Sequence, residues 1–321
     1  MGNESRSSFF GRYSAVIGLV RLFFNKRDYL IIGGASLAWM LRALAGSVMF
    51  PLSIGIVVNH LNEGGQGLPL MTLTFLILSL SINLLTEWVF RPYNYLFARK
   101  ISEMRKHLAD TINKMNSASE ASANKISDDL IGKLTSDVDF VMWNLSGVIA
   151  TIIPNLLTAS LAVVTIAYTN LPMAGISTLI LPLYLLVVRK YSNEVFNIRM
   201  EERRIFSRII KMSGDVVNGY SDNNLYDEAL NSWNKVMHRQ ITIDRVYWTY
   251  ALFFMGVGPI ILLFFGVHLV NQSLLSVGNL VTIVLAANNI YWPIAALVWG
   301  FALLSQTVPA AKRIEETLDM T

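Results

Sequence analysis

Two charged side chains inside long apolar stretches could do chemistry in a membrane. Arg42 lies about 13 residues into an apolar stretch that begins near residue 29, and Glu87 lies about four residues before the end of the next stretch. A charge that faces lipid at the bilayer centre costs at least about 2.5 kcal/mol, so we expect Arg42 to face a wet interior. Lining of a substrate cavity and a buried hydrogen-bonding role both remain open for Arg42.

The predicted depths of these two charges argue against a direct ion pair within one chain. They differ by about nine residues, or about 13 Å along a helix, which is longer than an arginine side chain. We therefore favour a structural role for Glu87 at the membrane interface over a place in a cavity.

Amides and indoles form a single stripe on the last apolar stretch. Asn288, Trp292, Trp299 and Gln306 fall within about 40° of one another at 100° per residue. Such a stripe suits an amphipathic cargo, and it equally suits helix–helix packing through amide hydrogen bonds. With Trp39 of the first stretch included, the substrate-cavity candidates are Trp39, Arg42, Glu87, Asn288, Trp292, Trp299 and Gln306.

The residue types and their spacing do not predict an enzyme active site or a metal site. The chain has no cysteine, and its four histidines are dispersed without the spacing of metal ligands. No nucleophile elbow and no phosphate-binding G-x-x-x-x-G-K-[ST] loop occurs. We therefore expect no catalytic residue, no metal and no cofactor in this chain.

The composition indicates an all-α membrane protein. Of 321 residues, 53% are hydrophobic and 15% are charged, and the mean hydropathy is +0.46. Apolar runs of about 18 to 25 residues match the thickness of a bilayer core. We predict six transmembrane helices, at about 29–58, 70–90, 145–169, 172–190, 247–270 and 278–308.

The distribution of positive charge predicts the orientation. Arg189 and Lys190 end the fourth span and are counted with the loop that follows it. Apart from Arg42, all Lys and Arg residues then lie before the first span, between the second and third, between the fourth and fifth, or after the sixth. The loops near 59–69, 170–171 and 271–277 hold none. By the positive-inside rule, both termini are cytoplasmic. Anionic lipid beside these segments accounts for the pI near 9.2, so nucleic acid is not required as a partner.

The two long inner loops are predicted to form helical hairpins that extend well into the cytoplasm. Apolar residues recur every three or four positions from Ile101 to Met115 and from Ile205 to Val216, which is the pattern of amphipathic helices. Polar, turn-forming residues mark the tips of the hairpins, where another domain could dock. The candidates for that contact are Ser117, Ser119, Glu120, Ser122, Asn124, Tyr220, Ser221, Asp222, Asn223, Asn224 and Tyr226.

The segment before the first span is too short and lacks the small-residue site of a cleaved signal peptide. We expect it to lie along the membrane surface as an elbow, with its apolar residues facing lipid. Those apolar residues are Phe9, Phe10, Tyr13, Val16 and Leu19.

Three local motifs stand out along the chain. The first runs from Gly132 through Asp137-Val138-Asp139. The second runs from Ser213 to Gly219 and is followed by Tyr226-Asp227-Glu228. The third combines Pro293 with Ala310-Ala311-Lys312-Arg313-Ile314.

Together with the predicted topology, these motifs resemble the transmembrane domain of type IV ABC exporters, which move drugs, lipids and peptides. Lys133 of the first motif stands where that family often has arginine. The third motif is similar to the family's junction with its nucleotide-binding domain.

The resemblance implies an ABC exporter transmembrane domain in a domain-swapped dimer, with a second copy or a homologous half-transporter as the partner. ATP and Mg²⁺ would be bound by a nucleotide-binding domain that this sequence lacks, fused C-terminally or separate, so that the chain alone is no enzyme. We divide residues 1–321 into an elbow segment (1–28), six spans (29–308) and the start of a linker (309–321). We expect the natural chain to continue beyond Thr321.

The expected function is therefore alternating-access export of an amphipathic peptide, lipid or drug-like molecule across a bacterial or archaeal plasma membrane. Two alternatives remain open from the sequence. One is a proton-coupled transporter of related fold that needs no ATPase, and the other is a membrane scaffold without a transport cycle.

Overall fold

The structure is a computed structural model that describes residues 13–118, 136–179, 181–217 and 223–319. Within these ranges the ordered elements are all helical, which confirms the predicted all-α class. The elements are α2 (Ser14–Phe23), α3 (Lys26–Leu44), the π-helical η1 (Ala45–Met49), α4 (Phe50–Asn62), α5 (Leu70–Ala118), α7 (Val138–Thr169), α8 (Leu171–Leu179), α9 (Leu181–Val217), α10 (Asn223–Asn271) and α11 (Val277–Asp319).

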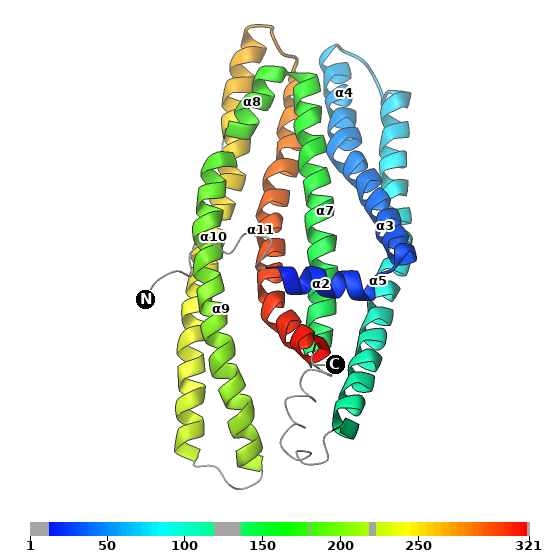
Figure 1. The fold of residues 1–321 in the computed structure, drawn as a ribbon. Coiled ribbons are helices and arrows are strands. Elements are labelled where there is room, and N and C mark those ends of the chain that lie inside the picture. The colour runs from blue at the N-terminus through cyan, green and yellow to red at the C-terminus, as the bar shows by residue number, and fades with distance from the viewer. Residues whose placement is uncertain (1–12, 119–135, 180, 218–222, 320–321) are drawn as a thin grey trace.

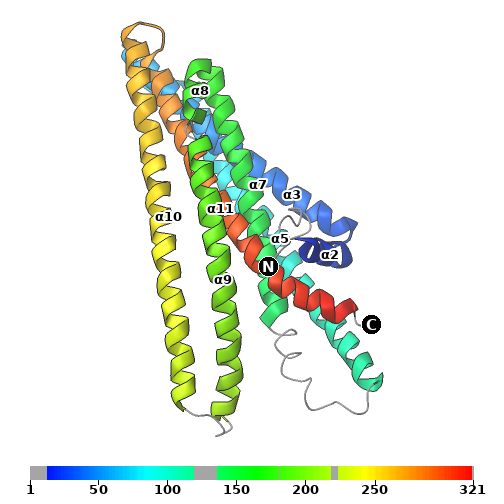
Figure 2. The ribbon, with the colours of Figure 1, turned by 60° about the vertical axis from the view of Figure 1, so that its left-hand side comes forward.

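The long helices run side by side as an elongated bundle, and α2 lies across it (Figure 1). Helices α7 and α11 form the centre, α3 to α5 lie on one side, and α9 and α10 lie on the other. Turning the molecule shows that the α9–α10 pair separates from α7 and α11 towards its far end (Figure 2). The bundle therefore has two groups of helices that meet along only part of their length.

Five helical segments of the described chain are long and apolar enough to cross a membrane. They are Lys26–Asn62, Leu70–Lys114, Val138–Thr169, Asn224–Asn271 and Val277–Leu318. These segments establish a multi-pass membrane protein. The fourth predicted span, 172–190, overlaps a shorter apolar helix, Leu171–Leu183. The crossing of the membrane by this fourth span, and with it the total of six, therefore remains a prediction.

Helix α5 continues without interruption beyond the membrane segment, as the sequence periodicity predicts. Ile101, Met104 and Leu108 are buried along the same face of its second half. On the other side, α9 continues in the same manner and buries Ile209. The amphipathic pattern thus correctly identified both helical extensions.

The elbow helix α2 packs on protein with the face that the sequence assigned to lipid. Tyr13, Val16 and Leu19 are buried in the cluster that also contains residues of α5, α7 and α11. The expectation that these three side chains face lipid is wrong, because the most apolar face of α2 covers the meeting point of three helices. Phe9 and Phe10 lie outside the described residues.

A π-helical segment interrupts the first span directly before a proline. Pro51 has no backbone N–H, and its ring would clash with the carbonyl four residues back in a regular helix. The backbone shifts instead to a longer spacing, in which the Phe50 N–H donates to the Ala45 carbonyl. Asn289 of α11 donates to the Gly46 carbonyl at 3.1 Å, and Ser79 of α5 donates to the Ala45 carbonyl at 3.3 Å. Side chains from two other helices therefore satisfy the irregular turn.

The backbones of helices α4 and α11 approach each other closely at two glycines, Gly55 and Gly278. A Cβ on Gly55 would overlap Thr282, and one on Gly278 would overlap the Gly55 carbonyl. At the same crossing, Asn59 Oδ1 accepts a hydrogen bond of 2.8 Å from the Gly278 N–H. Gly278 is in the first turn of α11, where backbone N–H groups lack helical partners. At this crossing the two helices therefore pack closely, and one of them also supplies a hydrogen-bond acceptor to a free backbone N–H at the start of the other.

A buried ionic cluster fixes the start of α3 against α5. The Asp28 carboxylate is fully buried, and it lies 2.5 Å from Arg99 and 2.7 Å from Lys100, whose side chain is only 1% exposed. Glu103 completes the cluster at 2.6 Å from Lys100. Asn25 caps α3 and also donates its backbone N–H to Asp28 at 2.9 Å. From the sequence alone, the charged run Arg99–Lys106 is expected to form a solvated or headgroup-facing surface of the helical extension. That expectation is wrong for Lys100, which is buried.

The buried cluster leads to the first prediction. Asp28→Asn removes the charge that faces Arg99 and Lys100, so we expect the free energy of unfolding to fall by about 3 kcal/mol, since the buried Lys100 then loses its buried counter-charge and keeps only the partly exposed Glu103. The measurement is unfolding of the purified protein in mixed detergent micelles. Asp110→Asn, at an exposed position of the same α5, is the matched control and should change little. Equal stability of the two variants would contradict a structural role for the cluster.

Candidate translocation surface

Arg42 and Glu87 form an ion pair within the chain, contrary to the sequence-based expectation. Arg42 Nη1 donates to Glu87 Oε1 at 2.5 Å, and the side chains are 47% and 61% exposed. The error lay in measuring depth from predicted span edges, because α3 and α5 extend beyond them. Counted from the shared turn between Asn62 and Leu70, Arg42 and Glu87 lie 20 and 17 residues away, at similar depth.

The stripe predicted on α11 is an open face in the structure. Trp292 and Trp299 are 52% and 49% exposed, Asn288 is exposed, and Gln306 is half-buried. The opposite face of α11 is buried, with Ile290 fully enclosed. The helix therefore presents its amides and indoles on the face opposite to the buried Ile290.

Trp39 does not share this open face. Its ring stacks on Phe90 at 5.4 Å and meets Tyr93 edge-on at 5.3 Å, and it is buried between α3 and α5. The structure thus places Trp39 in packing, while its neighbour Arg42, about one turn further along, reaches an exposed surface.

An aromatic group that the sequence analysis missed links three helices next to the stripe. Tyr191 of α9 stacks on Tyr247 of α10 at 3.9 Å, and Trp248 of α10 lies 6.3 Å from Trp292 of α11. The Tyr191 hydroxyl donates to Asp244 at 2.7 Å. The adjacent aromatic pair at 247–248 was the available signal, but its partners are far away in sequence.

Charged residues from two sequence motifs meet at the end of the bundle that carries α2. Arg313 of α11 lies 2.6 Å from Asp137, and Arg105 of α5 lies 2.8 Å from Asp139. Val138 between the two aspartates is fully buried. The short segment 137–139 therefore joins α5, α7 and α11 by one buried side chain and two ion pairs.

Comparison with known proteins gives the family. The model of the ABC transporter transmembrane region matches residues 37–216, more than half of the chain. This chain belongs to the ABC transporter transmembrane family. The matched region contains Arg42, Glu87 and the 137–139 segment, whereas the α11 stripe lies after it. The interpretation of that stripe as a candidate cargo surface therefore depends on its exposure in the structure and not on the family match.

One relative of this ABC transporter domain is the "Multidrug resistance-like ATP-binding protein MdlA" of Buchnera aphidicola subsp. Baizongia pistaciae (strain Bp). The two sequences are 20% identical over 287 residues, which cover 84% of this chain and 48% of the relative. The chain thus spans about half the length of that protein.

Few of the predicted ATPase-domain contacts can be placed in this ABC transporter domain. Ser117 lies in the last turn of α5, Asn223 and Asn224 begin α10, and the Tyr226 hydroxyl lies 3.3 Å from Ser213 Oγ of α9. The last contact closes the end of the α9–α10 pair. The other candidates lie outside the described residues: Ser119, Glu120, Ser122, Asn124, Tyr220, Ser221 and Asp222.

In the described part of the chain, no three His, Asp or Glu side chains gather in a way that could hold a metal ion. The acidic side chains of the candidate surface are instead engaged with cations or hydroxyls, as for Glu87 and Asp244.

The exposure of the Arg42–Glu87 pair leads to the second prediction. Solvent-exposed ion pairs contribute about 0–1 kcal/mol, so a double-mutant cycle of Arg42→Ala and Glu87→Ala should give a coupling energy in that range. The measurement is again the free energy of unfolding in micelles. A coupling of several kcal/mol would mean that the pair is desolvated, and it would contradict a wet surface at this depth.

Proposed function

We propose that this chain is the membrane-spanning, substrate-translocating domain of an ATP-driven ABC exporter. The observation that carries the proposal is the open stripe of α11, with Trp292 and Trp299 half-exposed in a chain of the ABC transporter transmembrane family. Tryptophan side chains in a membrane domain offer flat apolar surface together with one N–H donor. The name of the multidrug resistance-like relative is compatible with this function.

The proposed cargo is amphipathic: a peptide, a lipid or a drug-like molecule. Asn288 and Gln306 would accept or donate hydrogen bonds, and the two indoles would cover apolar parts of the cargo. The Arg42–Glu87 pair adds a charged patch whose two signs balance, so it favours neither an anionic nor a cationic cargo strongly. This combination suits loose recognition of several molecules rather than a tight fit to one.

The proposed mechanism couples ATP to the bundle through its long helices. A nucleotide-binding domain, fused to the chain or separate, would hold ATP and Mg²⁺ and would contact the ends of the extensions formed by α5, α9 and α10. Closure of two such domains would move the extensions as levers and alternate the access of the cavity between the two sides. This chain would supply no catalytic residue.

We further propose a dimer, with a second copy or a homologous half-transporter, in which α9 and α10 cross to the partner. The separation of α9 and α10 from α7 and α11 supports this arrangement (Figure 2). A partner or lipid would cover the exposed apolar side chains of the membrane helices, such as Leu84 and Leu85 of α5 and Phe264 of α10.

The proposed topology has six spans, 29–308, flanked by the elbow at 1–28 and a linker at 309–321, with both termini in the cytoplasm of a bacterial or archaeal cell. Positive charge on one side supports this orientation. The third prediction tests it with single cysteines, because the chain contains none of its own. In spheroplasts, a membrane-impermeant maleimide should label Gln66→Cys and Leu274→Cys but spare Lys114→Cys and Asn224→Cys.

Inverted vesicles should give the reverse labelling pattern. If residues 171–190 do not cross the membrane, Lys114→Cys and Asn224→Cys would be labelled from opposite sides. That outcome would contradict six spans without questioning the family. The cysteine-free parent protein is the control for background labelling.

The fourth prediction tests transport itself. Inverted vesicles that contain the chain with its ATPase partner should accumulate amphipathic fluorescent dyes or peptides in the presence of ATP and Mg²⁺. The double variant Trp292→Ala/Trp299→Ala should lower the initial rate at least threefold, since it removes apolar contact area with the cargo. Trp88→Ala, at a highly exposed position of α5, is the matched control and should leave the rate unchanged.

The same assay distinguishes the two alternatives. Uptake that follows a proton gradient and ignores ATP would identify a proton-coupled transporter of related fold. Absence of uptake under both conditions, with protein that is folded and correctly oriented, would identify a scaffold. Equal loss of rate in the Trp88 and Trp292/Trp299 variants would contradict the assignment of the cavity to α11.

A further inference from the structure

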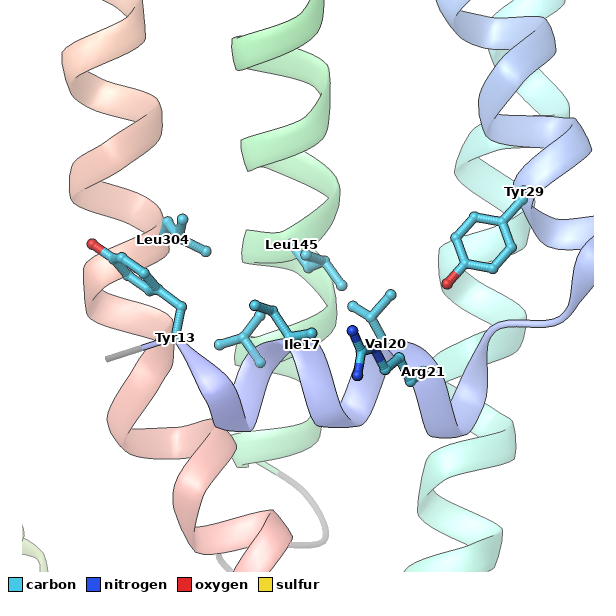
Figure 3. A pocket seen from close by; sticks show the side chains of 8 residues that line it. Tyr13, Ile17, Val20, Arg21, Tyr29, Leu145 and Leu304 are labelled. Carbon is cyan, nitrogen blue, oxygen red and sulfur yellow. The ribbon is translucent and has the colours of Figure 1, made fainter. Parts of the chain in front are cut away.

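A pocket of about 350 Å³ lies between the elbow helix and the spans, away from the exposed stripe of α11. Figure 3 shows side chains from α2, α3, α7 and α11 around it. Its walls are mainly apolar, and polar groups come from a few residues. The lining consists of Tyr13, Val16, Ile17, Val20, Arg21, Tyr29, Leu145 and Leu304.

The two ends of this pocket differ in chemistry. At one end, the Tyr13 hydroxyl is engaged with Ser305 Oγ at 3.2 Å. Towards the other end, Figure 3 shows the Arg21 guanidinium beside Val20 on α2 and the Tyr29 hydroxyl on α3. The apolar walls between the ends are formed by residues such as Leu145 and Leu304. The pocket is therefore an apolar slot with a cationic end.

Arg21 forms no ion pair with any carboxylate of the described residues, unlike Arg42, Arg99 and Arg313, which all do. The Glu315 carboxylate comes close to α2 at Gly18 and does not pair with Arg21. An arginine beside an apolar slot, left without an acidic partner in a chain rich in ion pairs, is complementary to an anion.

The position of α2 identifies the source of that anion. This helix lies across the direction of the spans (Figure 1) and buries one face in the bundle, while Ile17 and Leu22 remain exposed on it. An amphipathic helix with exposed apolar residues, perpendicular to membrane-spanning helices, is typical of the interface between headgroups and acyl chains. A ligand with an anionic head and an apolar tail is available at that depth.

We propose that this pocket binds one anionic phospholipid, with its phosphate on Arg21 and Tyr29 and part of an acyl chain between α2, α7 and α11. The volume is at the lower end of that of ligand pockets, which suits a segment of a chain rather than a whole lipid. The assignment to the cytoplasmic leaflet, where anionic lipids carry the negative surface potential, rests on the orientation proposed above. Binding itself requires neither ATP nor cargo.

The test is native mass spectrometry of the purified protein titrated with phosphatidylglycerol or phosphatidylcholine of identical acyl chains. We expect one tightly held phosphatidylglycerol per chain and weaker binding of phosphatidylcholine. Arg21→Ala should weaken phosphatidylglycerol binding roughly tenfold, the effect of losing a charge-assisted hydrogen bond. Arg27→Ala, an exposed arginine near the same interface, is the matched control and should leave binding unchanged.

A second pair of variants tests the acyl slot. Ile17→Trp places a ring in the pocket from a partly exposed position and should weaken binding of both lipids, whereas Leu22→Trp, outside the pocket lining, should not. Equal weakening by Arg21→Ala and Arg27→Ala would overturn the proposal in favour of general attraction to basic residues. Unchanged binding in Ile17→Trp would overturn it as well. Either result would leave the transport assay, and with it the proposed function, unaffected.

Discussion

Lipid offers no hydrogen-bond partner, and the arrangement of the helices depends on this constraint. Inside a bilayer, each break in the backbone pattern must be satisfied by the protein itself. The π-helical turn of the first span is satisfied by Asn289 and Ser79. At the predicted edge of the membrane, Asn59 satisfies the first turn of α11 in the same way. Each of these side chains belongs to another helix. The irregular points of the bundle are thus also the points at which its helices are fixed to one another.

Ion pairs take over this role at the end of the bundle that carries α2. Asp28 joins α3 to α5, Asp139 joins α7 to α5, and Asp137 joins α7 to α11. Three acidic residues therefore connect four helices in a row. Because the fully buried Asp28 is held by two cations, its links resist separation more than an exposed pair would. Helices α3, α5, α7 and α11 form one unit at this end, and α9 and α10 stand apart from it.

The sequence predicted those features whose signal is local. Long apolar runs gave most of the spans, and the spacing of Met104 and Leu108 gave the extension of α5, because helical periodicity is written in neighbouring residues. Features that depend on register between distant segments were missed. Arg42 and Glu87 pair because the turn near residue 66 sets their common depth. Lys100 was assigned to the surface because a buried cation and an exposed one have the same local pattern.

The α11 stripe shows how the two groups of helices communicate. Trp292 belongs to the open face, yet its ring also lies 6.3 Å from Trp248 of α10. Nearby, the Tyr247 hydroxyl reaches the Ala295 carbonyl at 3.5 Å. A rotation of α9 and α10 relative to the unit of α3, α5, α7 and α11 has to change these contacts. Under the proposed function, the surface that contacts the cargo is therefore also the surface whose contacts change when α9 and α10 move. Coupling between the two does not require a chain of contacts through the rest of the bundle.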